Sequence, residues 1–382
     1  MPSIRIATFN VENLFARWKF DRNVDPSEAN KRGWTVDETL FDELSVDDRA
    51  LTGMAIREVD ADVLALQEVE NVDTLKHFRA GALGGRRGYP YVAGIDGNDP
   101  RLIDVAVLSR LPIMHVRSYQ HLLDPVTKTA TLFSRDCLEA DIDAGDGKTV
   151  TLFVNHLKSM MGGRDTTRGK RERQAAAVKE IITKRLGGSP GDEAFVVLGD
   201  LNDYLETDEQ GSTGIAELVE WDQLENTVMR LPEDQRWTHF WPKGKAYKQL
   251  DYLLPSRRLV DTNDRPPEIM RKGTPLRAER YTGERFVGVG KTTRRRPTTA
   301  RWSWNLRSDT WGGRFRAPEA GCRRQRQRIP RRRHLRGPEL PRRARLAQAE
   351  PTRAPTWRAH REHSPSLGAL RGQARRSTLP RR

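Results

Sequence analysis

The stretch Ala194-Phe195-Val196-Val197-Leu198-Gly199-Asp200-Leu201-Asn202 joins an unbroken apolar run to polar residues that follow it directly. A short, wholly apolar run bounded by loops is typical of a strand that is buried on both faces. Side chains that follow such a strand lie at the edge of the sheet, where loops build functional sites. The stretch therefore predicts a covered sheet with Asp200 and Asn202 at its edge.

Runs of this kind recur along the first 290 residues, separated by helical patterns and polar loops. We expect strands at 4–10, 63–67, 104–108, 131–140, 149–155, 194–198 and 250–254. We expect helices at 51–60 and 168–186, and a long polar insertion over 17–50. This order predicts an α/β (α+β) domain in which helices cover sheets.

Four more polar residues close, follow or interrupt these apolar runs: Asn10, Glu68, His156 and Asp251. A single polar residue at a strand end is commonly a cap or a turn former. Several such ends that all carry carboxylate, amide or imidazole groups instead indicate one site at one edge of the sheets.

The chemistry of this set favours a bound cation and a phosphate ester. Mg²⁺ prefers oxygen ligands, often one or two carboxylates together with water and a substrate phosphate, which suits Glu68 and the amide oxygen of Asn10. Asp200 can orient an attacking water or accept its proton, and Asn202 can hold that carboxylate or a phosphate oxygen. His156 can donate a hydrogen bond to phosphate as negative charge develops on it.

These residues lie in short motifs that resemble the endonuclease/exonuclease/phosphatase superfamily. The motifs are Thr8-Phe9-Asn10-Val11-Glu12-Asn13, Leu66-Gln67-Glu68-Val69, Asn155-His156-Leu157-Lys158-Ser159, Leu198-Gly199-Asp200-Leu201-Asn202-Asp203 and Gln249-Leu250-Asp251-Tyr252. The resemblance spans residues 4 to 290 and implies a four-layer sandwich of two stacked mixed sheets flanked by helices. It also implies hydrolysis of phosphodiester or phosphomonoester bonds that depends on Mg²⁺, with Mn²⁺ as a substitute.

The resemblance assigns a role to each residue. It implies a metal site supported by Asn10, Glu68 and Asp251, a catalytic set of His156, Asp200 and Asn202, and substrate binding by Lys158, which could equally be a solvated side chain. Arg110, in Leu108-Ser109-Arg110-Leu111-Pro112, also matches the family and suggests a structural role.

One family motif is missing, namely the Ser-Asp-His-x-Pro-Val that opens the last core strand and supplies a catalytic Asp–His dyad. After Asp251 the only histidines are His334, His360 and His363, and Asp precedes none of them. Reading Arg296-Pro297-Thr298-Thr299-Ala300-Arg301-Trp302 from the third base of the Arg296 codon permits TCC-GAC-CAC-TGC-CCG-GTG, which encodes Ser-Asp-His-Cys-Pro-Val. We therefore hypothesise a frameshift between about Phe286 and Arg296, which the nucleotide sequence of codons 286–302 would decide.

The charge distribution agrees with a change of reading frame. The whole chain has a net charge of +15, but residues 1–290 carry −7 and residues 291–382 carry +22, with 26 Arg and one Lys in this tail. Such an apolar-poor segment is expected to be disordered, and the last core strand is expected to be missing. We therefore divide the chain into an enzyme domain, 1–290, and an out-of-frame tail, 291–382. The alternative is a genuine basic arm that binds nucleic acid through phosphate contacts.

Three functions remain open at this point. The forms of the Asp200 and Asp251 motifs favour a nuclease-like phosphodiesterase with a nucleic-acid substrate, impaired by loss of the dyad. The alternatives are a phosphatase for a small or lipid phosphomonoester and an inactive remnant. The basic run 164–173 is either a nucleic-acid patch or a solvated helix face. With two cysteines, no signal peptide and no apolar run of the roughly 18 residues that a membrane span needs, we expect a cytoplasmic protein, and we expect a monomer.

Overall fold

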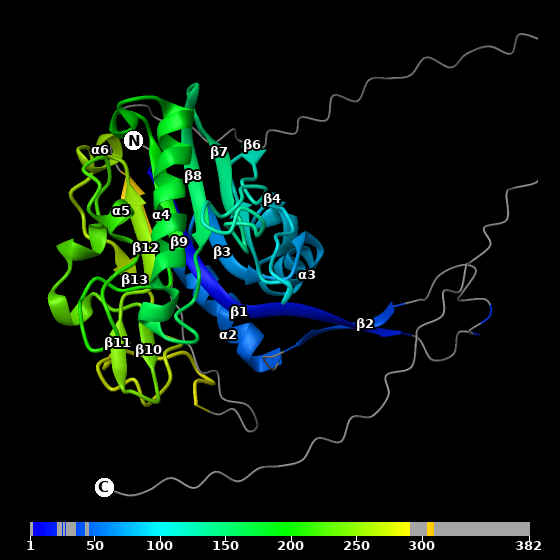
Figure 1. Cartoon of the computed structure of the whole chain (residues 1–382). Helices are drawn as coiled ribbons and strands as arrows, with labels where there is room; N and C mark the ends of the chain where they lie inside the picture. Colours follow the sequence, from blue (N-terminus) through cyan, green and yellow to red (C-terminus); the bar gives the residue numbers. More distant parts are fainter. Residues whose placement is uncertain are drawn as a thin grey trace, which may run out of the picture. The chain divides into compact units, whose positions relative to one another are not determined.

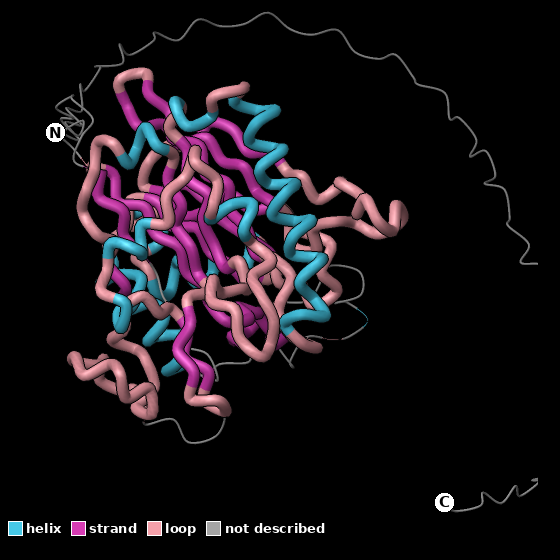
Figure 2. Tube along the Cα trace, turned by 60° about the vertical axis from the view of Figure 1, so that its left-hand side comes forward, coloured by secondary structure: helices cyan, strands magenta, loops and turns pink. Residues whose placement is uncertain are grey.

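Two mixed β-sheets lie face to face between helices (Figures 1 and 2). The chain divides into the units Met1–Glu319 and Ala320–Arg382. The structure, a computed structural model, describes residues 3–20, 25, 27, 36–42, 46–290 and 304–308, all within the first unit. The second unit therefore lies outside the described residues.

The strands are β1 (Ile4–Phe20), β2 (Val36–Asp42), β3 (Val63–Val69), β4 (Tyr91–Gly94), β5 (Asp104–Ser109), β6 (Ile113–Arg117), β7 (Cys137–Gly145), β8 (Lys148–His156), β9 (Phe195–Asp200), β10 (His239–Trp241), β11 (Ala246–Lys248), β12 (Asp251–Pro255), β13 (Glu268–Ile269) and β14 (Trp304–Ser308). The helices are α2 (Val46–Val59), α3 (Val72–Ala82), α4 (Arg164–Leu186), α5 (Ala216–Val219) and α6 (Arg257–Val260).

The first sheet has the order β13-β14-β1-β3-β5-β4, with β2 paired to β1, and the second has the order β12-β9-β8-β7-β6. Within each sheet one central pair is parallel, β1 with β3 and β8 with β9, and the other pairs are antiparallel. A separate hairpin joins β10 to β11.

Alternating side chains along the strands divide the apolar residues among three cores. In β3, Val63 and Ala65 belong to the core between the sheets, whereas Leu64 and Leu66 pack in a second core with residues of α2 and α3. In the second sheet, Phe195 and Val197 pack with residues of α4 and α5 in a third core. Because successive side chains of a strand point to opposite faces, each sheet is covered on both sides. The expected four-layer sandwich is confirmed.

Most expected elements are present. The strand expected at 131–140 begins later, at Cys137, because residues 131–136 form an isolated bridge followed by bends. Within the segment 17–50, expected to be a long polar insertion, the described residues extend β1 to Phe20 and contribute β2 and the start of α2. Helix α3, β4, β6 and the β10–β11 hairpin were not expected. Among the described residues, no helix is long and apolar enough to cross a membrane.

The last core strand was expected to be missing from the first sheet, but a strand, β14, lies next to β1. The backbone of β14 pairs antiparallel with β1, with Ile4 opposite Ser308 and Ile6 opposite Leu306. The expectation of a missing strand is therefore wrong for this backbone. The physical reason is that the N–H and C=O groups of β1 can pair with any extended segment, whatever its side chains. Apart from 304–308, the tail expected to be disordered lies outside the described residues.

Candidate active site

Asn10, Glu68, His156 and Asp200 come together where the central strands of the two sheets end. Asn10 pairs with Gln67 across the parallel strands β1 and β3, and His156 pairs with Asp200 across β8 and β9. Parallel neighbours end at the same edge of a sheet, so each pair brings its polar residues to one place. The stacking of the sheets then brings the two pairs within hydrogen-bonding distance of each other.

The Asn10 amide joins the two sheets. Its Nδ2 donates to Glu68 Oε1 at 2.9 Å and to Asp200 Oδ2 at 3.0 Å, while its Oδ1 accepts from the Glu12 backbone N–H at 3.0 Å. The second Glu68 oxygen, Oε2, accepts from the Asn13 backbone N–H at 3.1 Å. The half-buried Glu68 and the buried Asp200 are thus held side by side, which requires neutral donors or a cation between them.

His156 faces both carboxylates. Its Nε2 lies 3.6 Å from Asp200 Oδ2 and 3.9 Å from Glu68 Oε1. The same nitrogen lies 3.1 Å from Arg135 Nη2, which also donates to the Leu157 carbonyl. Acidic and basic groups of the site therefore meet at this one nitrogen of the imidazole.

The basic groups were not recognised from sequence. Arg135 Nη1 lies 3.5 Å from Asp99 Oδ2, and Asp99 also binds Arg101 through Nη2 at 3.0 Å. Burial alone would raise the pKa of Asp99, but the hydrogen bonds from Arg101 and the charge of Arg135 outweigh it and lower that pKa. Burial lowers the pKa of Lys158, and the charges of Arg135 and Arg101 lower it further, so Lys158 lies in the same cationic cluster.

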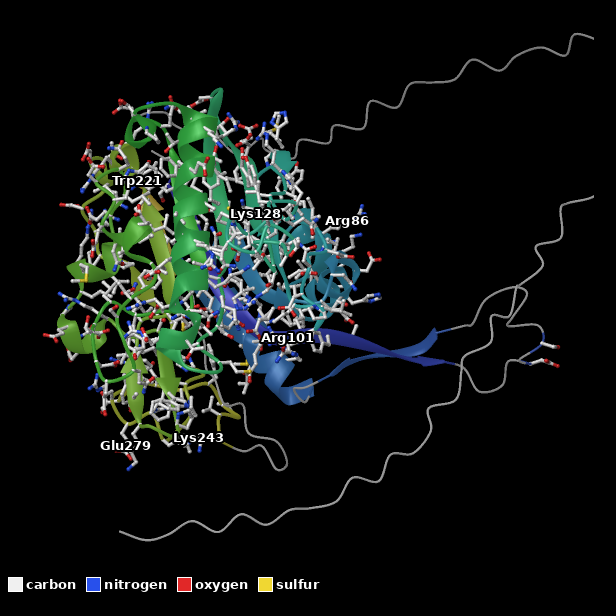
Figure 3. All side chains as sticks on the ribbon, in the orientation of Figure 1. Arg86, Arg101, Lys128, Trp221, Lys243 and Glu279 are labelled. Atoms are coloured by element: carbon white, nitrogen blue, oxygen red, sulfur yellow. The ribbon has the colours of Figure 1, made fainter. Side chains whose placement is uncertain are left out.

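The only local signal for this cluster is that Arg135 and Arg101 lie just before apolar strands rather than after them. An arginine before a strand is too common to single out. Figure 3 shows Arg101 on the side of the body from which β1 and β2 extend.

The backbone takes a positive φ at three positions of the site. Glu68 has φ +64° and Asn202 has φ +53°, the left-handed region that residues other than glycine seldom adopt. Gly199 has φ +133°, and a Cβ there would lie 1.9 Å from the Asn155 carbonyl oxygen of the neighbouring strand. Strain of this kind clusters at functional sites because the surrounding structure must hold it in place.

Asn202 is held by the loop it belongs to. Its N–H donates to Asp200 Oδ1 at 2.9 Å, and its Nδ2 donates to the Leu157 carbonyl at 3.1 Å. The next residue, Asp203, is fully buried and binds Arg164 through one oxygen and Arg171 through the other, each at 2.7 Å. Helix α4 thereby fixes the loop that carries Asp200 and Asn202.

Four of the five basic residues in the run 164–173 belong to neither of the two surfaces considered above, and only Arg168 has exposed ion pairs. Arg164 and Arg171 are buried in ion pairs with Asp203, and Lys170 and Arg173 both pair with Asp124 at 3.0 Å. The sequence pattern does not reveal this burial, because a helix that binds buried acidic loops has the same composition as one that faces water.

Asp251 is the first residue of β12 and the backbone partner of Asp200. Its side chain is buried, and its N–H donates to Thr238 Oγ1 at 3.0 Å. Arg110, expected to be structural, pairs with Asp60 and Asp62. The structure thus places Asp251 next to the site through the sheet and Arg110 in an ion-pair cluster with two carboxylates.

Comparison with protein families identifies this arrangement. Residues 5–284 match the model of the "Endonuclease/Exonuclease/phosphatase family". The chain belongs to that family. No curated protein sequence matches it significantly.

Solved structures with a similar arrangement share little sequence with this family member. Truncated TDP2 of Caenorhabditis elegans is 16% identical, with 79% of this chain and 96% of that chain covered and a TM-score of 0.46. The human Nocturnin catalytic domain is 16% identical, with coverage of 70% and 85% and a TM-score of 0.45. A mannosyl-6-phosphatase of Bacteroides thetaiotaomicron is 15% identical, with coverage of 66% and 85% and a TM-score of 0.42.

Members of this family generally use a divalent metal, and the residues present fit one. One oxygen each of Glu68 and Asp200 and one ring nitrogen of His156 all lie within 4.8 Å of one another. Carboxylates beside a side-chain amide form an oxygen-rich set that suits a hard cation. The Asn10 amide has its nitrogen toward the carboxylates, and a half-turn of that amide would present its oxygen instead.

Proposed function

We propose that this site hydrolyses phosphodiester bonds in a nuclease-like reaction that depends on a divalent metal, Mg²⁺ or Mn²⁺. The observation that carries the proposal is the meeting of carboxylates and a guanidinium at one atom of His156. Glu68, Asp200 and Arg135 all approach the Nε2 of its imidazole. Carboxylates suit a cation, guanidinium suits a phosphate oxygen, and a phosphate ester bound to a metal needs both.

The residues divide the work as follows. Glu68 and Asn10 would hold the ion, with Asp251 supporting that side of the site, and the ion would polarise the phosphate. Asp200 orients the attacking water and accepts its proton, because Asn10 and Asn202 fix both of its oxygens.

His156 and Asn202 donate to phosphate oxygens as negative charge develops on them. Arg135 and Lys158 add fixed positive charge to the same group. Arg135 is held by the Leu157 carbonyl and by Asp99, so it needs little reorganisation when phosphate binds.

A substrate panel separates the two enzymatic candidates. The chain is incubated with Mg²⁺ and either supercoiled plasmid, bis-p-nitrophenyl phosphate or p-nitrophenyl phosphate. We expect nicked plasmid and hydrolysis of the diester. Release of phosphate from the monoester, with the diester left intact, would favour the phosphatase and refute the proposal.

We further infer that the chain with this tail is a weak enzyme, since the Asp–His dyad is absent from its sequence. The family match ends at residue 284, before the Arg-rich tail, and β14 begins at Trp304, two positions beyond the last residue whose shifted triplets permit the missing motif. A chain in which the reading frame is restored before residue 296 should hydrolyse the diester at least 100-fold faster, because several kcal/mol of transition-state stabilisation return. Equal rates for the two chains would refute this inference.

A further inference from the structure

The β10–β11 hairpin carries an exposed aromatic residue on a preformed support. Trp241 is 45% exposed, and a Cβ at Gly244 would lie 2.7 Å from its Cε3 atom. The indole is therefore packed against the bare backbone of the hairpin turn. This packing leaves part of the ring open to solvent and restricts its rotation.

Two lysines lie in the turn that follows Trp241. Lys243 and Lys245 are exposed, and within the described part of the chain neither forms an ion pair. The ammonium groups are therefore available to an external anion. An exposed aromatic ring in the same turn as cations that lack carboxylate partners suits single-stranded nucleic acids, because bases stack on the ring while phosphates contact the cations.

The base of the hairpin also combines aromatic rings with positively charged groups. Trp237, Tyr247 and Tyr281 belong to one small apolar cluster, and the guanidinium groups of Arg271 and Arg280 lie 4.4 Å and 4.5 Å from the ring centres of Trp237 and Tyr247. Figure 3 shows Lys243 and Glu279 at the same end of the molecule.

The distribution of charge sets this region apart from the rest of the domain. Residues 237–248 and 270–290 together carry a net charge of +6, whereas residues 1–290 as a whole carry −7. The remainder of the domain repels a polyanion, so the local excess of positive charge would direct one to this end.

The hairpin is anchored to the active site on two sides. Thr238, directly before β10, accepts hydrogen bonds from the N–H groups of Leu250 and Asp251, both at 3.0 Å. On the other strand, Lys248 Nζ lies 4.0 Å from the ring centre of Tyr204, two residues beyond Asn202. Trp241 lies three residues beyond Thr238, or about 10 Å along an extended strand.

We propose that this hairpin, with Trp241, Lys243 and Lys245 at its tip, binds an unpaired stretch of nucleic acid next to the phosphate that is hydrolysed. The inference rests on the proposed function and deepens it by naming a single-stranded flank as part of the substrate. Bases within a duplex are stacked on each other, so an unpaired base is needed to cover the indole.

Photo-crosslinking tests the proposal in the full-length chain. The probe is a single-stranded DNA oligonucleotide with 5-iodouracil, in EDTA so that no hydrolysis occurs. We expect the adduct in the tryptic peptide 237–243, its loss in Trp241→Ala, and at least tenfold less adduct when the oligonucleotide is annealed to its complement. Absence of an adduct on this peptide, or an equal yield from the duplex, would overturn the proposal.

Salt dependence provides a second measurement that does not rely on the ring. Lys243→Gln combined with Lys245→Gln should reduce the slope of log affinity against log salt by about 1.4, or about 0.7 for each phosphate of a single strand that a lysine no longer neutralises. Lys128→Gln combined with Lys184→Gln is the matched control, and Figure 3 shows Lys128 well apart from Lys243. The Arg-rich tail is common to both variants, so its contribution cancels. Equal slopes in the two double variants would overturn the proposal.

Two further results distinguish binding of single-stranded nucleic acid from binding of lipid and from the proposed hydrolysis. If vesicles of anionic phospholipid bind the chain, and Trp241→Ala abolishes that binding but not the DNA adduct, the tip is a lipid anchor and the proposal fails. Hydrolysis of bis-p-nitrophenyl phosphate by the unaltered chain reports on the proposed function alone. An adduct without hydrolysis would refute the proposed function, and hydrolysis without an adduct would refute this inference.

Discussion

Replacing Arg171 by methionine tests whether helix α4 holds the active-site loop. The Arg171 side chain is fully buried, and all three of its guanidinium nitrogens donate hydrogen bonds. Its Nε donates to Asp203 Oδ2 at 2.7 Å, and its Nη1 and Nη2 donate to Thr167 Oγ1, the Lys158 carbonyl and the Arg164 carbonyl. Methionine fills much of the same volume but removes the charge and every donor, so Asp203 keeps its negative charge in a dry environment.

The size of the expected stability loss depends on the partners that Asp203 keeps in the Arg171→Met variant. Removing one partner of a buried ion pair costs about 3–5 kcal/mol of unfolding free energy, because the other charge is left uncompensated. Arg164 still binds Asp203 Oδ1, and the Gly214 N–H still donates to Oδ2 at 2.8 Å. The loss should therefore lie near the lower limit, at about 3 kcal/mol.

Urea denaturation followed by circular dichroism measures this difference. The matched control is Arg168→Met, since Arg168 lies on the same helix but its ion pairs, with Asp165 and Glu172, are exposed. Exposed pairs contribute about 1 kcal/mol or less. A loss below about 1 kcal/mol in the Arg171 variant, or equal losses in both variants, would refute the role assigned to α4.

Three further changes test other parts of the site. Glu68→Gln should weaken Mn²⁺ binding by at least tenfold in calorimetry, because it removes one of the two carboxylates that face His156. Gly199→Ala should destabilise the fold by more than about 2 kcal/mol in urea, because the added Cβ meets the Asn155 carbonyl and the φ of +133° is strained for alanine. Asp104→Asn should increase stability at pH 8, because burial and neighbouring acidic groups raise the pKa of Asp104 to about 7.

The direction of the pH dependence expected for Asp104→Asn follows from the linkage between folding and proton binding. The folded state binds a proton that the unfolded state, with a carboxyl pKa of about 3.9, releases, so wild-type stability falls as the pH rises from about 4 to 7. The stability gain of the variant should therefore grow over that interval, and a constant gain would contradict the assignment. Asp73→Asn, an exposed carboxylate, is the control for this variant.

The Glu68→Gln and Gly199→Ala variants each need a control that separates the proposed cause from a general loss of structure. Glu68→Gln must keep the wild-type circular dichroism spectrum, and unchanged Mn²⁺ affinity would remove Glu68 from the proposed metal site. Gly84→Ala serves beside Gly199→Ala, since Gly84 also has positive φ but has nothing within 4 Å of its Cβ position. Equal losses in the two glycine variants would show that steric contact with Asn155 is unimportant.

The layers of the fold could be predicted from the sequence because burial leaves a local pattern. Strands such as Phe195–Asp200 are apolar on both faces, which requires a cover on each side. The candidate site residues could be proposed for a similar reason, because each closes, follows or interrupts such a run. Elements without a strong pattern, such as the three-residue strands β10 and β11, could not be predicted, because their few residues carry too little periodicity.

The sequence by itself determined which residues are buried in strands and which polar groups stand at their ends, because both depend on residues close together in the chain. It also revealed the change in composition near residue 290. Only the tertiary structure decided which of these groups meet. Asn10 and Asp200 are 190 positions apart yet share a hydrogen bond, and Arg171 is buried against Asp203 although its own helix resembles an exposed one. Partners across such distances are chosen by how the two sheets and α4 pack, and packing is a property of the whole domain rather than of any local segment.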